Sequence, residues 1–172
     1  MLINNSYQSP LGEIILLSND KYLLGLWFSD QQYFGAKYNL AESQMGNSHP
    51  ISEAKKWLTN YFAGQKPSIS NIPLSPEVTD FRQSVLKVLV KVPYGSTITY
   101  QEIADKIPAE HSTGHTAARA VGGAVGHNPI SLIIPCHRVV GSDGSLTGYA
   151  GGIDRKIQLL KLEGINLTQL HE

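Results

Sequence analysis

Cysteine is almost absent from this chain of 172 residues, because Cys136 is the only one. A single cysteine excludes an internal disulfide and any zinc site built on paired cysteines. It leaves one free thiol, which fits a reducing compartment. Because a lone cysteine is most often a small buried hydrophobe, its neighbours must decide whether it has a chemical role.

Charge and long apolar runs are also scarce. Charged residues make up 16% of the chain and the formal net charge is zero, which argues against a strongly electrostatic nucleic-acid binder. The window 111–142 contains no Asp or Glu but holds Arg119, Arg138 and four histidines, so local charge permits DNA binding without requiring it. No segment approaches a membrane span, and residues 1–5 lack the basic start of a secretion signal. We therefore expect a cytoplasmic protein.

The rest of the composition is that of an ordinary folded protein, with 41% apolar residues in a length that suits one compact domain or two small ones. Residues 7–28 alternate turns with apolar runs and predict a β-hairpin. Ser52 can cap a helix that ends near Phe62. The proline-rich stretch 65–76 is typical of a linker, so we place a domain boundary near Ser75.

The second half predicts several short helices. Apolar residues recur at helical spacing after Thr79 and Asp80, either of which can cap this helix. Thr99 and Glu102 have the spacing of a capping box that opens a shorter helix. Another short helix over 117–125 follows, and two short helices joined by a turn suggest a helix-turn-helix.

In the predicted helix 117–125, which Thr113 or Thr116 begins, six of the nine residues are Ala or Gly. Each glycine costs a helix about 1 kcal/mol relative to alanine. So little side chain lets a helix approach a narrow groove closely, with Arg119 projecting from it. The simpler alternative is a helix pair that serves only as a packing unit.

The final helix places a carboxylate where a helix disfavours it. Asp154 can cap this helix and Gly164 can end it, so Glu163 falls in the last turn. A negative charge there faces the negative end of the helix dipole, at a cost of about 0.3 to 1 kcal/mol. A hydrogen-bonded role would offset this cost, and full solvation would also make it tolerable.

The only cysteine lies between an apolar run and a His-Arg pair. Pro135 restrains Ile134 to an extended conformation, so the thiol that follows is held in place. A thiol with a pKa of about 8.5 becomes a nucleophile near pH 7 when an imidazole takes its proton or a positive charge stabilises the thiolate. His137 and Arg138 are the nearest groups that can do so, which makes Cys136 the candidate nucleophile.

Several motifs accompany this cysteine in a specific order over about residues 78–165. They are Val92-Pro93-Tyr94-Gly95, Thr99-Tyr100-Gln101-Glu102-Ile103-Ala104, Ala117-Ala118-Arg119-Ala120-Val121-Gly122-Gly123-Ala124, Ile134-Pro135-Cys136-His137-Arg138-Val139, Gly148-Tyr149-Ala150-Gly151-Gly152 and Leu162-Glu163-Gly164. The combination resembles the O6-alkylguanine-DNA alkyltransferase (methylated-DNA–protein-cysteine methyltransferase) family in its stand-alone bacterial-type form. The resemblance implies an α+β fold: a small ribonuclease H-like domain of β-sheet and helix over 1–75, then a mainly helical, winged helix-turn-helix-like domain over 76–172.

The resemblance implies direct-reversal DNA repair by a methylated-DNA–protein-cysteine S-methyltransferase. An alkyl (methyl) group would pass irreversibly from O6-alkylguanine, and from O4-alkylthymine, to Cys136 after the base is flipped from the minor groove. The thioether product is stable, so each molecule would act once. The implied partner is double-stranded DNA that contains O6-alkylguanine, bound by a monomer with no cofactor and no metal. Some members of the family carry zinc in the N-terminal half, and a single cysteine cannot reproduce that thiolate site.

The resemblance also assigns roles to catalytic residues. Cys136 would attack the alkyl carbon, with His137 as its base through a water molecule and Glu163 holding the imidazole in its working tautomer. Tyr100 would donate its hydroxyl to the departing guanine. Asn128 would tie its turn to the cysteine segment.

In the family, the small-residue helix lies in the minor groove, and an arginine fills the gap left by the flipped base. The implied DNA-binding residues are Arg119, Ala118, Ala120, Gly122, Thr99 and Arg138. The implied base pocket is formed by Tyr149, Ala150, Val139 and Pro135. Ala150 stands where many relatives have serine. The implied contact comes from the main chain, so we expect the change to be tolerated without any hydroxyl contribution.

Three other hypotheses remain open. A relative that binds the lesion without transfer is disfavoured because Cys136 occupies the nucleophile position. A small helix-turn-helix regulator would keep its function in a Cys136→Ala variant. A cysteine hydrolase would turn over an ester or peptide. The N-terminal half carries no motif that indicates chemistry, and we expect it to support the C-terminal half.

Overall fold

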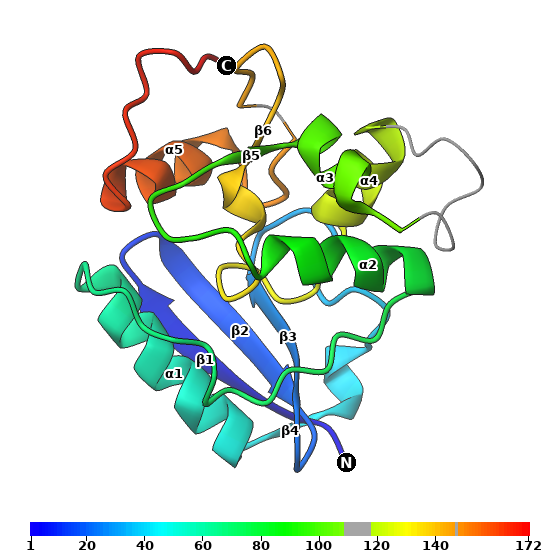
Figure 1. Ribbon diagram of the computed structural model, residues 1–172. Helices are drawn as coiled ribbons and strands as arrows, with labels where there is room; N and C mark the ends of the chain where they lie inside the picture. The colour runs from blue at the N-terminus through cyan, green and yellow to red at the C-terminus, as the bar shows by residue number, and fades with distance from the viewer. Residues whose placement is uncertain (109–117, 147) are drawn as a thin grey trace. The chain divides into compact units, whose positions relative to one another are not determined.

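The computed structural model describes residues 1–108, 118–146 and 148–172 and divides the chain into two compact units (Figure 1). The first consists of Met1–Glu77 with Pro129–Ser131, and the second of Val78–Asn128 with Leu132–Glu172. Pro129–Ser131 joins the first unit through backbone hydrogen bonds to Leu26. The Leu26 N–H donates to the Pro129 carbonyl at 2.8 Å, and the Ser131 N–H donates to the Leu26 carbonyl at 2.9 Å. The sequence predicts that two separately folding domains meet near Ser75, and this boundary stays a prediction.

The first unit is built on a sheet with the strand order β3-β2-β1-β4. Its strands are β1 (Ile3–Ser9), β2 (Gly12–Ser18), β3 (Leu23–Phe28) and β4 (Gln44–Met45). The β1–β2 and β2–β3 pairs are antiparallel, whereas β1 and β4 run parallel. The predicted hairpin is confirmed as β2–β3. The sequence did not predict β1, because its residues are mostly polar and lack the apolar alternation of a half-buried strand.

The core of this unit lies between the sheet and α1 (His49–Phe62). Strand β3 is buried along its whole length, and the Trp27 ring folds back over Gly25. A Cβ atom at Gly25 would lie 1.9 Å from that ring, so only glycine fits there. The buried face of α1 consists of Pro50, Ile51, Ala54, Trp57, Leu58 and Tyr61. Trp57 is therefore a core residue.

The helix α1 begins one turn earlier than the predicted cap at Ser52. The Ser48 hydroxyl accepts the Ile51 N–H at 3.2 Å and is the N-cap. Pro50 lies in the first turn, where the N–H that proline lacks has no partner within the helix. The preceding polar stretch contains only β4 and a short 3-10 helix, η1 (Leu40–Glu42).

The second unit contains α2 (Asp80–Leu89), α3 (Tyr100–Lys106), α4 (Ala118–Gly126) and α5 (Ile153–Leu162). Thr79 caps α2, and Thr99 and Glu102 form the predicted capping box at the start of α3. The helices α2, α3 and α4 pack on one another. Their buried side chains are Ser84, Val85, Leu86, Leu89, Ile103, Ala104, Val121, Ala124 and Val125.

The connection between α3 and α4 falls in 109–117, outside the described residues. The predicted helix starts at Thr113 or Thr116, and the predicted first helical residue Ala117, lie in that segment. The described part of the small-residue helix begins at Ala118 and ends at Gly126, one residue beyond the predicted end.

The last elements surround the cysteine segment. A 3-10 turn, η3 (Cys136–Arg138), leads into β6 (Val139–Val140), which pairs in parallel with β5 (Ile98–Thr99). Gly152, not the predicted Asp154, is the N-cap of α5. Gly164 has a φ of +79°, the left-handed conformation that ends a helix, and Glu163 is the C-cap.

Candidate active site

The nucleophile candidate begins a tight turn that local hydrogen bonds hold in place. The Asn128 side-chain amide donates to the Ile134 carbonyl at 2.8 Å, and the Arg138 N–H donates to the Pro135 carbonyl at 3.0 Å. Cys136 is 4% exposed, so its thiol lies in a site from which most water is excluded. The turn thus fixes the sulfur before any substrate arrives, as the proline in the sequence indicates.

His137, the next residue, is fully buried, and its Nε2 lies 2.6 Å from Glu163 Oε2. Burial lowers the pKa of His137, and the hydrogen bond to Glu163 offsets only part of this effect. The imidazole is therefore neutral near pH 7, with the Nε2 proton donated to the carboxylate. This tautomer places the basic lone pair on Nδ1, as a general base requires.

Glu163 accepts hydrogen bonds on both carboxylate oxygens. Oε1 accepts from the Gly95 N–H at 3.0 Å and from Arg138 Nε at 2.8 Å, and Oε2 accepts from His137 and, at 3.1 Å, from Arg138 Nη2. Burial alone would raise the pKa of Glu163, but these donors lower it to about 2. The carboxylate is therefore ionised at neutral pH.

Arg138 lies in the interior of the second unit, beside Glu163. It is 7% exposed, its guanidinium holds Glu163 with two hydrogen bonds, and Nη1 donates to the Val92 carbonyl at 2.7 Å. Its charge neutralises the buried carboxylate and lies 5.8 Å from the centre of the Tyr94 ring. In the structure Arg138 is thus a structural partner of Glu163, and a contact between Arg138 and DNA stays a prediction.

A negative charge on the Cys136 sulfur shifts the pKa of three ionisable side chains. Burial raises the pKa of Tyr100 and raises that of Tyr149 well above its ordinary value, and a thiolate at Cys136 raises both further. Both phenols are therefore protonated and can donate a hydrogen bond. Within the described residues, the buried Tyr149 hydroxyl makes no hydrogen bond.

The third of these side chains is Lys156, which is not one of the predicted site residues. Its side chain is 1% exposed and Nζ donates to the Val139 carbonyl at 2.5 Å. Burial lowers its pKa to about 8, against the opposing effect of the Cys136 charge. A signal was present in the sequence, because Lys156 falls on the apolar stripe of α5 between Ile153 and Leu160, where a solvated lysine is out of place.

A shallow depression of about 400 Å³ lies on the α4 side of the second unit. It is lined by Tyr100, Ala118, Arg119, Gly122 and Gly148. Arg119 is exposed there, as an arginine that reaches a ligand must be. Gly148 has a φ of +95°, and a Cβ atom on it would lie 2.9 Å from the Tyr100 hydroxyl. The absence of a side chain at Gly148 therefore keeps the Tyr100 hydroxyl accessible.

The remaining predicted residues are divided between the surface and the interior. Ala120 is exposed on α4, and Thr99 is half-buried, with its hydroxyl accepting the Glu102 N–H at 3.0 Å. Ala150 is half-buried in the glycine-rich loop. Val139 and Pro135 are buried beside the cysteine turn. That Ala150, Val139 and Pro135 line a base pocket stays a prediction.

The turn at residues 93–95, which belongs to one of the sequence motifs but had no assigned role, contacts the site residue Glu163. Gly95 donates to Glu163, and the Tyr94 hydroxyl donates to the Leu162 carbonyl at 3.1 Å.

Over 1–108, 118–146 and 148–172, no group of three or more His, Cys, Asp or Glu side chains is arranged to hold a metal ion. In the same ranges, no helix is long and apolar enough to cross a membrane.

Fold and site together define a class of protein: a ribonuclease-like sheet domain precedes a helical domain with a buried Cys-His pair. The model of the 6-O-methylguanine DNA methyltransferase ribonuclease-like domain matches residues 2–76, and that of the DNA binding domain matches residues 80–165. The chain belongs to the methylated-DNA–protein-cysteine methyltransferase family. The predicted α+β fold class is thereby confirmed.

Relatives match over nearly the whole chain. A methylated-DNA–protein-cysteine methyltransferase from Methanosarcina barkeri is 46% identical over 93% of this chain and 96% of its own length. A Haemophilus influenzae protein of the same name is 40% identical over 92% and 84%. The crystal structure of the Mycobacterium tuberculosis O6-methylguanine methyltransferase is 41% identical, with a TM-score of 0.79 over 95% of this chain and 93% of that one. A structure of the Mycobacterium tuberculosis protein in complex with DNA is 39% identical, with a TM-score of 0.80 over 98% and 94%.

Proposed function

We propose that this protein repairs alkylated DNA by moving the alkyl group of O6-methylguanine to its own cysteine, Cys136. One observation carries the proposal: Cys136, His137 and Glu163 are all buried and the His137 imidazole is hydrogen-bonded to Glu163, in a chain of the methylated-DNA–protein-cysteine methyltransferase family. These residues supply a thiol that is held in place, a neutral imidazole and an ionised carboxylate, which together activate a nucleophile.

The transfer step exchanges one bond for another. The Cys136 thiol gives its proton to His137 through one water molecule, and Sγ attacks the alkyl carbon in line with the bond to guanine O6. The S–C bond forms as the O6–C bond breaks, and its electron pair leaves with the base. Glu163 stabilises the imidazolium that results, because its carboxylate already accepts the Nε2 proton at 2.6 Å.

The departing guanine needs its developing negative charge stabilised. Tyr100 donates its hydroxyl to the base, which is consistent with its raised pKa and its place in the α4 depression. The Lys156 ammonium favours the thiolate over the thiol, because the two charges interact across a buried site. These groups stabilise charge where it develops and need no cofactor.

DNA recognition is assigned to α4. Ala118, Ala120 and Gly122 have small side chains, so a duplex minor groove can approach the helix closely. The exposed Arg119 enters the stack and replaces the flipped base, an exchange that offsets an unstacking cost of a few kcal/mol. Thr99 contacts the backbone of the same duplex.

The flipped base enters between the cysteine turn and the glycine-rich loop. Tyr149 stacks on it, a main-chain N–H near Ala150 reaches O6, and Val139 and Pro135 shape the wall. Asn128 keeps the turn in register through its bond to Ile134. The same pocket accepts O4-alkylthymine, the other alkylated base with its lesion on an exocyclic oxygen.

Consumption of the protein follows from the product. A thioether at Cys136 is stable, so one monomer repairs one lesion. A thiol that must stay reduced until it meets a lesion requires a reducing compartment, which points to the cytoplasm.

Intact-mass measurement tests the proposal. The protein is incubated with an excess of duplex that contains one O6-methylguanine, beside the Cys136→Ser variant and an unmodified duplex. A gain of one methylene per molecule, only in the wild type and only with the lesion, is expected. Lesion binding without a mass gain would identify a non-catalytic binder, neither binding nor gain would favour a regulator, and repeated turnover of an ester would favour a hydrolase.

A further inference from the structure

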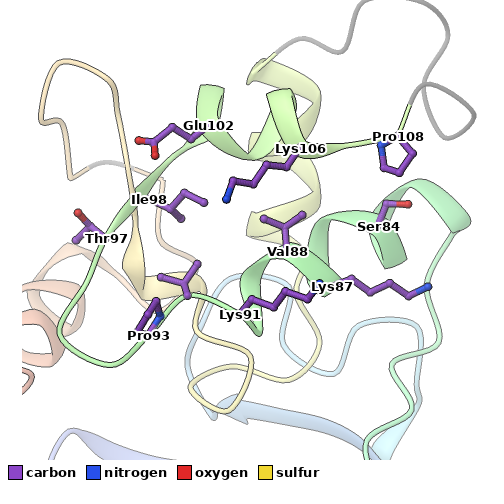
Figure 2. A pocket seen from close by; sticks show the side chains of 11 residues that line it. Ser84, Lys87, Val88, Lys91, Pro93, Thr97, Ile98, Glu102, Lys106 and Pro108 are labelled. Carbon is purple, nitrogen blue, oxygen red and sulfur yellow. The ribbon is translucent and has the colours of Figure 1, made fainter.

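A second concave site lies on the second unit, in a groove between α2 and α3 (Figure 2). Its volume is about 530 Å³, within the range of sites that bind small molecules or peptide side chains. Its lining residues are Ser84, Lys87, Val88, Lys91, Val92, Pro93, Thr97, Ile98, Glu102, Lys106 and Pro108. None of them lines the depression beside α4.

The walls of this groove are fixed in advance. The Val92 carbonyl accepts from Arg138 at 2.7 Å, and Ile98 pairs with Val139 in the short parallel sheet. Glu102 is held by the capping box, where its carboxylate accepts the Thr99 N–H at 3.3 Å. A ligand would therefore find a formed site, which spares it the cost of ordering one.

The chemistry of the groove combines an apolar floor with a basic rim. Val88 and Ile98 lie between the walls, while Lys87 and Lys91 come from the α2 side and Lys106 from α3 (Figure 2). All three lysines are exposed, and none forms an ion pair with any residue in the described part of the chain. With Glu102 as the opposing charge, the lining carries a net charge of +2, three positive less one negative, in a chain whose formal net charge is zero.

The groove faces away from the side of α3 that serves the repair site. Successive residues of an α-helix are rotated by about 100°, so Glu102 lies about 200° from Tyr100 and Lys106 about 240° from it. Tyr100 lines the α4 depression, whereas Glu102 and Lys106 line the groove. The groove and the α4 depression therefore open on different sides of α3.

We infer that the groove between α2 and α3 binds a peptide segment of a partner protein, one that presents a bulky apolar side chain flanked by carboxylates. The apolar floor accommodates the side chain, and the lysines on both walls pair with the carboxylates. A nucleic-acid backbone supplies the negative charge but no apolar side chain for the floor. The inference does not depend on the alkyl-transfer chemistry.

Fluorescence anisotropy with a labelled peptide, Asp-Asp-Leu-Phe-Asp-Asp, tests the inference on the full-length protein. We expect saturable binding that weakens at least about tenfold in the variant Lys87→Glu/Lys91→Glu/Lys106→Glu. A matched variant with the same charge change in the first unit, Lys55→Glu/Lys56→Glu/Lys66→Glu, should keep the wild-type affinity. Replacing the Leu-Phe pair of the peptide with Ser-Ser should also weaken binding at least about tenfold.

Folding of the variants is checked by the rate of methyl transfer from a lesion duplex, which the groove variant should keep because none of its three positions belongs to the repair site. Methyl resonances of Val88 and Ile98 should shift when the peptide is added. The inference is overturned if the peptide does not bind saturably, or if both triple variants lose affinity equally. Loss of duplex affinity in the groove variant, with peptide binding unchanged, would make the groove a nucleic-acid surface and overturn it as well.

Discussion

Replacing Glu163 with glutamine isolates what the buried carboxylate contributes to the fold and to the chemistry. In the wild type, Oε1 and Oε2 together accept four hydrogen bonds from Gly95, Arg138 and His137. In a Glu163→Gln variant, the amide nitrogen replaces one oxygen and faces donors. The Arg138 guanidinium also loses its buried counter-charge.

The size of the effect follows from the pKa. Lowering the pKa of Glu163 from 4.5 to about 2 corresponds to about 3 kcal/mol of folding stability at neutral pH. Breaking a buried ion pair by removing one partner costs a similar amount, about 3 to 5 kcal/mol. We therefore expect Glu163→Gln to lower the free energy of unfolding by about 3 kcal/mol or more at pH 7.

The sign of the pH dependence is fixed by the direction of the shift. The folded state holds the Glu163 proton less tightly than the unfolded state, so this stability is present above pH 4.5 and is lost as pH falls towards 2. The variant has no carboxyl group at position 163 to titrate. The difference in the free energy of unfolding between wild type and variant should therefore shrink to roughly half near pH 3.

Urea unfolding at pH 7 and at steps down to pH 3 measures this gap. The control is Asp154→Asn, an exposed carboxylate in the first turn of α5, which should cost under about 1 kcal/mol. A gap at pH 7 below about 1 kcal/mol, or one that does not change with pH, would refute the account of Glu163.

Three further changes test separate parts of the site. Arg119→Ala should slow transfer from a lesion duplex by about 10- to 100-fold but leave the reaction with free O6-methylguanine base unchanged, because only the duplex requires a flipped base. An equal fall in the transfer rate from duplex and from free base would contradict this role. Gly148→Ala should destabilise the loop by about 1 to 3 kcal/mol and lower the transfer rate, because residue 148 has a φ of +95° and the new Cβ would lie 2.9 Å from the Tyr100 hydroxyl. The control Gly123→Ala, which has open space around its Cβ, should have neither effect. Lys156→Met should move the rising limb of the pH–rate profile to higher pH, because the thiolate loses a nearby positive charge; an unchanged profile would remove Lys156 from the mechanism.

Features that depend on neighbours in sequence could be predicted. Thr99 and Glu102 form a capping box because their three-residue spacing is sufficient for it. The position of Cys136 after a proline likewise indicated a thiol that is held in place, and the structure puts it at the start of a hydrogen-bonded turn. The start of α1 was missed although the signal was local, since Ser48 precedes a proline in the first turn.

Features that depend on distant partners could not be predicted. Arg138 and Glu163 are 25 residues apart in sequence, and nothing local indicates that the guanidinium turns inward to the carboxylate. Strand β1 is polar and joins the sheet through pairing with β2, which residue pattern alone does not reveal. Lys156 is buried because α5 packs its stripe inward, and its bond to Val139 crosses between elements.

The central claim is that Cys136 itself receives the alkyl group. It is tested most directly by reacting the protein with a duplex whose O6-methyl group carries deuterium, followed by digestion and tandem mass spectrometry. The account predicts one labelled methyl per molecule, on the sulfur of Cys136 and on no other residue. Label on His137 or elsewhere, or label released to solvent with the protein unmodified, would contradict it.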